Sequence, residues 1–358
     1  MSFAIAAAGT GGHVFPGLAV GEALIEAGVG REEILYIGGR RLESQVYPEA
    51  GFPFLMLELS GLQRRFTASN FTIPAVVLRA TTAISGALRN RGVRVVMGMG
   101  GYVTVPAGLA ARRAGATLFL HEQNAEAGLA NRFMASRARR VFGSFPNTTR
   151  LPKAEWVGNP VRSNLVGFDR VVLQTRARAR YGLDPQAPVL GVFGGSLGAG
   201  LINQAVVDLL GVNPPFPFQV LHLAGATHAP DLSEKTAASP QWRVLGFEEH
   251  MEWFYAASDL VVARAGGAVA ELTVTGTPSV LVPGGFGSGG HQYANAAVLA
   301  GAGAAVVLPE GHLQELGPTV MALLSDHSRL QRMVKACATL ARPGAADDVA
   351  QALVAAHG

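Results

Sequence analysis

The sequence predicts an α/β protein of two Rossmann-like domains, each built on a parallel sheet. Short apolar runs alternate with helix-like stretches along the chain, and several runs are apolar at successive positions, as in strands buried on both faces. Two segments also begin alike. A-I-A-A-A-G-T-G-G-H at 4–13 and V-L-G-V-F-G-G-S-L-G at 189–198 each read as a strand followed by a glycine-rich turn and a helix. The length of 358 residues fits two domains.

Two series of strands are expected. The first comprises residues 4–8, 34–37, 54–57, 93–97, 117–120 and 141–143. The second comprises residues 189–193, 220–223, 243–245, 260–263, 279–282 and 304–307. Turn residues cluster at Gly158-Asn159-Pro160-Val161, so we place the first domain at 1–160 and the second at 161–336. The last segment, from about Cys337 to residue 358, is expected to be helical.

Composition excludes several classes of protein. Hydrophobic residues make up 49% of the chain and charged residues 15%, which is too apolar for a disordered protein. Cys337 is the only cysteine, so intrachain disulfides and cysteine metal clusters are excluded, which fits a reducing compartment. The N-terminal apolar run lacks a basic region and is expected to be a strand, not a signal peptide. No apolar block reaches the ~20 residues that span a bilayer, so we expect any membrane contact to be peripheral.

Charge is divided unevenly along the chain. Residues 1–160 carry 17 Lys and Arg against 10 Glu, which gives +7, whereas residues 161–335 and 336–358 carry −2 and −1. A basic half beside an acidic half indicates that the first domain meets an anionic partner.

The first glycine-rich turn, G-T-G-G-H at 9–13, is a candidate ligand site. Because it joins a strand to a helix, Thr10, Gly11 and Gly12 would bring the backbone and the helix N-terminus close to an anion. The pattern is neither a complete G-x-G-x-x-G nor a Walker A motif, and a purely structural turn is the alternative. His13 falls at the carboxyl end of the strand, where it could act as a base or as a donor to a diphosphate.

A second turn of this kind, G-G-S-L-G-A at 194–199, opens the second half of the chain. Gly195 allows close approach of a ligand and Ser196 adds a hydroxyl donor, so a nucleotide diphosphate is the expected ligand. Two such turns favour two anionic ligands in a cleft between domains. A dehydrogenase would more often show one fingerprint with an acidic residue ~20 positions later.

Three further groups of polar residues follow expected strands. Asn124, in H-E-Q-N at 121–124, is suited to hydrogen-bond a sugar or acceptor hydroxyl, with loop capping as the alternative. Glu271 follows R-A-G-G at 264–267 and could accept two ribose hydroxyls, although such a residue is often an ordinary surface glutamate. Gln292, in G-G-H-Q-Y-A-N at 289–295, offers a donor and an acceptor to sugar hydroxyls, while His291 is either a ligand contact or a loop histidine.

No metal site or other cofactor is expected. The histidines lack H-E-x-x-H spacing, there is no D-x-D run, and the adjacent pair Asp347-Asp348 lies in the terminal segment. A leaving diphosphate would therefore be stabilised by helix N-termini and an arginine, for which Arg162 is best placed in the sequence.

Seven motifs in this order resemble the MurG family of glycosyltransferases. They are G-T-G-G-H-V-F-P-G-L-A at 9–19, M-G-x-G-G-Y-V at 97–103, H-E-Q-N at 121–124, G-N-P-V-R at 158–162, G-G-S-L-G-A at 194–199, R-A-G at 264–266 and H-Q-Y-A-N-A at 291–296. The resemblance implies a GT-B fold, with two Rossmann-like domains facing across a cleft and the terminal helix crossing back onto the first domain. It also implies a hexosyltransferase that moves N-acetylglucosamine, with inversion, from UDP-N-acetylglucosamine to the 4-hydroxyl of an undecaprenyl-diphosphate-linked muramoyl-pentapeptide.

The resemblance also implies the roles of individual residues. The donor would lie in the second domain, with Ser196 near its phosphates, Glu271 near the ribose and Gln292 near the sugar hydroxyls. Phe247 and Met251 would lie near the uracil, and Arg162 near the diphosphate. The first glycine-rich turn and Asn124 would face the acceptor. We expect His13 to be the catalytic base, with binding of the acceptor diphosphate or positioning of its hydroxyl as the alternative roles.

A basic and apolar segment near residue 70 is a candidate membrane surface. It combines the following residues: Arg64, Arg65, Phe66, Phe71, Ile73, Val76, Val77, Leu78 and Arg79, with Arg137, Arg139 and Arg140 as an extension. Apolar side chains with basic neighbours suit anionic lipid headgroups, whereas a core helix with a solvated basic flank is the alternative. With the resemblance, this predicts a peripheral enzyme of peptidoglycan synthesis at the cytoplasmic face of the cell membrane, and hence a role in cell shape and division.

Other functions remain open at this point. One is a related transferase with a different lipid acceptor such as diacylglycerol, and another is a UDP-N-acetylglucosamine 2-epimerase, which shares the fold but has no lipid acceptor. A non-catalytic protein that binds a nucleotide sugar is the third. H-E-Q-N and the basic, apolar segment favour a lipid-linked acceptor over the epimerase. Nothing in the sequence indicates a nucleic-acid partner.

Overall fold

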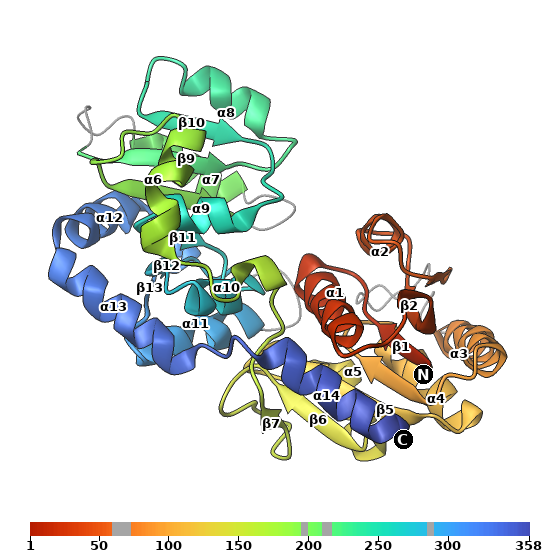
Figure 1. Ribbon diagram of the computed structural model, residues 1–358. Coiled ribbons are helices and arrows are strands. Elements are labelled where there is room, and N and C mark those ends of the chain that lie inside the picture. The colour runs from red at the N-terminus through yellow and green to blue at the C-terminus, as the bar shows by residue number, and fades with distance from the viewer. Residues whose placement is uncertain (59–72, 195–199, 210–216, 285–289) are drawn as a thin grey trace. The chain divides into compact units, whose positions relative to one another are not determined.

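The computed structural model describes residues 1–58, 73–194, 200–209, 217–284 and 290–358. The chain forms two compact units, of which the first comprises Met1–Arg162 with Arg342–Gly358 and the second comprises Ser163–Ala341. Figure 1 gives the order of their elements.

Among the described residues, the first unit contains a seven-stranded sheet in the order β3-β2-β1-β4-β5-β6-β7, with every pair parallel. Its strands are β1 (Phe3–Ala6), β2 (Ile34–Gly38), β3 (Phe54–Met56), β4 (Val95–Gly98), β5 (Thr117–Glu122), β6 (Arg140–Gly143) and β7 (Glu155–Trp156). Strand β1 is buried throughout, and its side chains alternate between two cores, which explains its unbroken apolar sequence.

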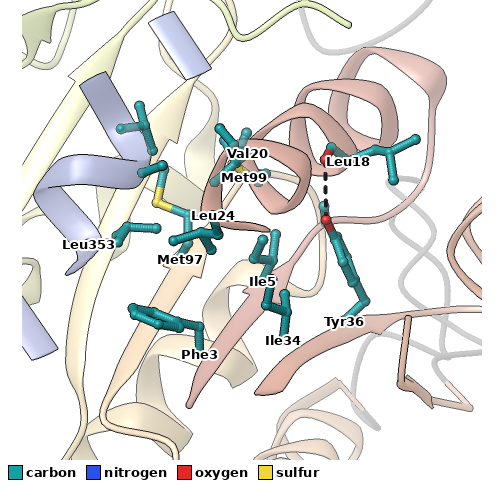
Figure 2. Close-up of a cluster of buried hydrophobic side chains, with 14 of the residues drawn as sticks. Phe3, Ile5, Leu18, Val20, Leu24, Ile34, Tyr36, Met97, Met99 and Leu353 are labelled. Atoms are coloured by element: carbon teal, nitrogen blue, oxygen red, sulfur yellow. Dashed lines mark hydrogen bonds between the residues drawn. The ribbon is translucent and has the colours of Figure 1, made fainter. Parts of the chain in front are cut away.

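Helices cover both faces of this sheet. The core on one face joins Phe3 and Ile5 of β1 to Leu24 of α1 (Gly11–Glu26) and Leu353 of α14 (Ala345–His357) (Figure 2). Helix α2 (Glu43–Glu49) contributes to this same core. The core on the other face joins Ala4 and Ala6 to α3 (Ile73–Asn90), α4 (Thr104–Ala114) and α5 (Leu129–Met134). The unit also contains the short helices η1 (Arg31–Glu33) and η3 (Ala135–Arg137).

The described part of the second unit repeats this plan with a six-stranded parallel sheet in the order β10-β9-β8-β11-β12-β13. Its strands are β8 (Val189–Phe193), β9 (Gln219–Leu223), β10 (Trp242–Leu245), β11 (Leu260–Ala263), β12 (Ser279–Leu281) and β13 (Ala305–Val307). Its helices are η4 (Ser163–Leu165), α6 (Arg170–Arg180), α7 (Gly200–Asp208), α8 (Ala229–Lys235), α9 (Met251–Ala257), α10 (Ala268–Val274), α11 (His291–Gly301), η6 (Glu310–Glu315), α12 (Leu316–Ser325) and α13 (His327–Leu340).

The structure confirms the predicted α/β class and parallel sheets. Each of the twelve expected strands is present, with ends within two residues of the prediction. The sequence did not predict β7, whose two residues pair with Phe142 and Gly143 at the edge of the sheet. None of the described helices is long and apolar enough to cross a membrane.

Candidate active site

The carboxyl ends of parallel strands share one edge of a sheet, and open α/β sheets bind ligands at that edge. In the first unit the loops after β1, β2, β4 and β5 all begin there. They carry the first glycine-rich turn, Gly39, Tyr102 and Asn124. The candidate site of this unit is therefore built from neighbouring strand ends.

The first glycine-rich turn leads directly into α1. Gly9 has φ of +108°, a conformation that glycine adopts without strain, and Thr10 is the extended N-cap residue. Gly11, Gly12 and His13 then form the first turn of the helix, as the sequence predicted for a strand–turn–helix. The backbone N–H groups of such a first turn are suited to bind an anion.

His13 is held between two segments of this edge. Its Nδ1 lies 3.2 Å from the Thr10 hydroxyl, within hydrogen-bond distance. On its other side is Gly100, where a Cβ atom would come within 3.1 Å of His13 Nε2. Gly100 therefore leaves the space that the imidazole occupies.

No role was predicted from the sequence for Glu43 or Tyr102, although Tyr102 stands in the motif M-G-x-G-G-Y-V at 97–103. Glu43, the first residue of α2, is completely buried, and its carboxylate accepts hydrogen bonds from Gly9 N (3.2 Å), Gly39 N (2.9 Å) and the Tyr102 hydroxyl (3.0 Å). Burial and the neighbouring Glu43 raise the pKa of Tyr102. For Glu43, the only signal in the sequence was an acidic residue near the start of a helix, which is also typical of a residue without a functional role.

His121 forms part of a buried hydrogen-bonded group after β5. Its Nε2 lies 2.8 Å from the carbonyl oxygen of Gly158, and its Nδ1 lies 3.1 Å from the amide nitrogen of Gln123. Burial lowers the pKa of His121 to about 4, so the ring is neutral at pH 7. In that form Nε2–H donates to Gly158 while Nδ1 accepts from Gln123.

Glu122 organises the loop that contains Asn124. One carboxylate oxygen accepts from both the backbone and the side-chain nitrogen of Asn124 at 3.0 Å, and the other accepts from Gly128 N (3.0 Å) and Asn131 Nδ2 (2.8 Å). For Glu122 the loop-capping alternative therefore describes the structure. Asn124 is half-buried at the site edge, where Glu122 fixes its orientation.

Arg162 is the last residue of the first segment of this unit. Its guanidinium lies 5.3 Å from the ring centroid of Phe15 on α1, in cation–π geometry. Burial raises the pKa of Glu22, also on α1, and the charge of Arg162 partly offsets that effect. Arg162 is thus associated with the helix that the first glycine-rich turn opens.

In the second unit, the predicted residues again follow strand ends. Gly195 and Ser196 lie outside the described residues, between the end of β8 and the start of α7. Phe247, after β10, is 64% exposed, whereas Met251, at the start of α9, is buried. An exposed phenylalanine at this edge is available to a planar ligand.

Glu271 is oriented by a residue that the sequence did not indicate. The buried Tyr255 of α9 donates a 2.7 Å hydrogen bond from its hydroxyl to Glu271 Oε2 on α10. Tyr255 lies in a helix with an ordinary apolar pattern, so nothing in the sequence around it indicated a functional role. Its contact fixes a carboxylate at the carboxyl edge of the second sheet.

Gln292 lies in the first turn of α11 and is anchored by its carbonyl. Its Oε1 accepts a 2.8 Å hydrogen bond from Gly284 N. Nearby, Arg264 donates to the carbonyl of Val282 (3.1 Å) and forms an ion pair with Glu310 (2.6 Å). These contacts fix the segments that follow β11 and β12 and the side chain of Gln292.

The structure thus divides the predicted residues between the two units. Thr10, Gly11, Gly12, His13, Asn124 and Arg162 lie in the first, and Phe247, Met251, Glu271 and Gln292 lie in the second. Within the described ranges, no group of three or more His, Cys, Asp and Glu side chains could hold a metal ion.

Comparison with known proteins identifies the family. Residues 3–143 match the N-terminal domain model of glycosyltransferase family 28, and residues 189–349 match its C-terminal domain model. A Halorhodospira halophila protein named UDP-N-acetylglucosamine--N-acetylmuramyl-(pentapeptide) pyrophosphoryl-undecaprenol N-acetylglucosamine transferase is 42% identical, with 97% of this chain and 96% of that protein covered. The crystal structure of Acinetobacter baumannii MurG covers 99% of this chain and 100% of its own, at 27% identity and a TM-score of 0.78. The chain belongs to the MurG family.

As a MurG family member, the chain is a hexosyltransferase with the GT-B fold, which confirms both predictions. Proteins with a different activity share the fold alone. The UDP-GlcNAc 2-epimerase from Neisseria meningitidis has a TM-score of 0.69 at 12% identity, with 99% of this chain and all of that chain covered. Membership of the MurG family favours transfer over epimerisation for this chain.

Proposed function

We propose that this MurG family member transfers N-acetylglucosamine from UDP-N-acetylglucosamine to the 4-hydroxyl of the muramoyl sugar in undecaprenyl-diphosphate-muramoyl-pentapeptide, with inversion at the anomeric carbon. The observation that carries the proposal is 42% identity, over nearly the whole length of both chains, to a transferase named for this reaction. The reaction would serve peptidoglycan synthesis, and through it cell-wall biogenesis, cell shape and division.

The second unit would bind the donor. Its acidic Glu271, fixed by the Tyr255 hydroxyl, is suited to accept the two ribose hydroxyls. Phe247 and Met251 would contact the uracil, Gln292 would contact the sugar hydroxyls, and Gly195 and Ser196 would bind the phosphates. No metal is assigned to the leaving UDP, which helix N-termini and Arg162 would stabilise instead.

The first unit would bind the acceptor. The first turn of α1, from Gly11 to His13, would offer backbone N–H groups to the acceptor diphosphate. His13 would remove the proton from the attacking hydroxyl while Thr10 orients the ring through Nδ1. Asn124, fixed by Glu122, would position that hydroxyl.

The reaction is tested with radiolabelled UDP-N-acetylglucosamine and three reaction mixtures. They contain the muramoyl-pentapeptide diphosphate lipid, diacylglycerol or no lipid. Label entering the first lipid alone is the expected result. Label in diacylglycerol, or conversion of the donor without any lipid, would contradict the proposed acceptor.

Two helices of the first unit expose apolar side chains close to arginines. On α3, Leu78 is 62% exposed beside the exposed Arg79. On α5, Phe133 is 54% exposed and the Arg137 guanidinium lies 5.0 Å from its ring centroid. Arg64, Arg65, Phe66 and Phe71 lie outside the described residues. We propose that these described side chains of α3 and α5 contact lipid at the cytoplasmic face of the membrane, because exposed apolar groups with arginine neighbours suit anionic headgroups.

Vesicle sedimentation tests the membrane proposal. Binding to vesicles with anionic lipid is expected to exceed binding to neutral vesicles, and the Leu78→Ser/Arg79→Ser variant is expected to lose most of that excess. Val171→Ser, at a valine 85% exposed on α6 of the second unit, is the matched control. Equal binding to both kinds of vesicle, or equal loss in the control, would contradict the proposal.

A further inference from the structure

Glu43 is a completely buried carboxylate that the proposed reaction does not itself use. Its Oε2 accepts from Gly9 N at 3.2 Å, while its Oε1 accepts from Gly39 N at 2.9 Å and from the Tyr102 hydroxyl at 3.0 Å. These three donors are uncharged. Burial of a carboxylate costs free energy, which hydrogen bonds such as these three offset. Because an apolar side chain would fill the same space without that cost, we look for a role of Glu43 other than packing.

The three donors belong to three neighbouring strand ends. Gly9 follows β1, Gly39 follows β2, and Tyr102 follows β4, and these strands lie side by side in the order β2-β1-β4. Tyr102 also covers the glycines. A Cβ on Gly9 would lie 3.5 Å from its ring, and a Cβ on Gly39 would lie 2.1 Å from its hydroxyl. One carboxylate therefore joins the loops at the centre of the first unit's site edge.

Two of these loops also hold His13. Gly9 directly precedes Thr10, whose hydroxyl lies 3.2 Å from His13 Nδ1. Gly100, two residues before Tyr102, is the glycine whose Cβ would come within 3.1 Å of His13 Nε2. Both sides of the imidazole are thus set by segments that Glu43 fixes.

We propose that Glu43 is a positioning residue for His13 and the first glycine-rich turn, acting through Gly9 and Tyr102. This inference rests on the proposed role of that turn at the acceptor. It also assigns the Gly9 N–H to Glu43 and not to a ligand. The donors for an acceptor diphosphate then come from the first turn of α1.

The variant Glu43→Gln tests the proposal. It keeps the side-chain size but replaces one acceptor oxygen with an amide donor, which must face Gly9 N–H or the two donors at Oε1. We expect kcat/KM for the lipid acceptor to fall about 10- to 100-fold, because hydrogen bonds to a charged group are being lost. We expect UDP affinity, measured by calorimetry, to stay within about twofold, and the melting temperature to fall modestly because buried donors lose their acceptor.

Two controls accompany this measurement. Glu49→Gln makes the same change at an exposed residue on the same helix and is expected to leave kcat/KM unchanged. Hydrogen–deuterium exchange provides a readout that does not depend on activity. In Glu43→Gln, the peptide covering residues 4–14 is expected to exchange faster, while peptides from the second unit are unchanged.

The outcomes separate this inference from the proposed reaction. If the parent protein transfers no sugar to the lipid acceptor, the proposed reaction fails. If it does, unchanged kcat/KM in Glu43→Gln overturns the positioning role, as does a loss of kcat/KM accompanied by weaker UDP binding. Should Glu43→Gln not fold, Tyr102→Phe decides. A lower acceptor kcat/KM with normal UDP affinity supports the role, and unchanged kinetics overturns it.

Discussion

His13 and His121 show how environment separates two histidines of one unit. His121 is fully buried, neutral at pH 7 and bonded to Gly158 and Gln123, so it is unsuited to exchange protons with a substrate. His13 is half-buried at the strand edge, with Thr10 at Nδ1. Only His13 therefore combines access and orientation for general-base catalysis.

Replacement of His13 by alanine tests its proposed role as base. We expect kcat to fall about 10²- to 10⁴-fold, the usual contribution of a positioned general base, with UDP affinity unchanged. Steady-state kinetics with the lipid acceptor and calorimetry with UDP measure the two quantities. The control is His327→Ala, at an exposed residue of α13. Near-normal turnover would contradict the role, and so would a loss of UDP affinity together with the fold.

Burial of His121 makes the stability of the first unit depend on pH. Its pKa is about 4 in the folded protein against an ordinary value of 6.5, so the unfolded state binds more protons between these values. The free energy of unfolding should therefore fall by on the order of 3 kcal/mol as the pH is lowered from 6.5 to 4. Above pH 6.5 the contribution of His121 to stability should be fully present.

Trp156 can report this effect, because it is the only tryptophan in the first unit. Denaturant unfolding is followed by its fluorescence in a Trp242→Phe/Trp253→Phe background. His121→Asn is expected to be less stable at pH 7 but to depend less on pH between 6.5 and 4. An identical pH slope in both proteins would show that His121 is not the titrating group.

The sequence predicted the residues at the strand ends better than the residues that support them. His13 and Asn124 stand directly after strands, so their positions could be inferred from the local pattern. Glu43 could not be found in this way, since its partners Gly9 and Tyr102 are brought to it only by the order of the strands. Tyr255 was missed for the same reason, because its partner Glu271 lies on a different helix.

At the scale of elements, strands buried on both faces were predictable because burial fixes their composition. Strand β1 supplies Phe3 and Ile5 to one core and Ala4 and Ala6 to the other, so each position must be apolar. Strand β7, at the sheet edge, has no such requirement, and its exposed Glu155 pairs with Arg140. The edge element therefore left no apolar run in the sequence.

The segment after β7 depends on a glycine. Gly158 has φ of +94°, and a Cβ there would lie 2.2 Å from the Cβ of Arg342. Gly158→Ala is therefore expected to destabilise the first unit by about 2–4 kcal/mol, through backbone strain and overpacking. Trp156 fluorescence during denaturant unfolding measures the change.

Gly86→Ala is the matched control for Gly158→Ala. Gly86 is exposed within α3, and a Cβ there would meet nothing within 4 Å. Alanine at this position is expected to stabilise the helix by about 0.5–1 kcal/mol. Equal stability of the Gly158→Ala variant and the parent protein would contradict the strain argument.

At the scale of the whole molecule, charge follows the two units. The first unit carries 19 Lys and Arg against 12 Asp and Glu, or +7, whereas the second carries 10 against 13, or −3. The excess of positive charge therefore belongs to the unit that we propose binds a diphosphate lipid at an anionic surface. The sequence predicted this division of charge between the units because net charge depends only on composition and not on where side chains point.

The C-terminal helix ties the end of the chain to the first unit. Val349, Ala350 and Leu353 of α14 are at most 1% exposed and belong to the same core as Phe3 (Figure 2). Arg342, where the chain returns to this unit, lies 3.5 Å from the ring centroid of Trp156. The residues of α14 thus complete a core that begins with the first strand.

Leu353→Ala should therefore destabilise the first unit and not the second. Removing a buried leucine side chain costs about 2–5 kcal/mol through lost burial and the remaining cavity. Trp156 fluorescence reports unfolding of the first unit, while Trp242 and Trp253, in a Trp156→Phe background, report the second.

The control is Gln351→Ala, at an exposed position of the same helix, which should change neither transition. If Leu353→Ala lowered both transitions equally, the two units would unfold as one cooperative body, and the separate stability argued for each unit would be wrong.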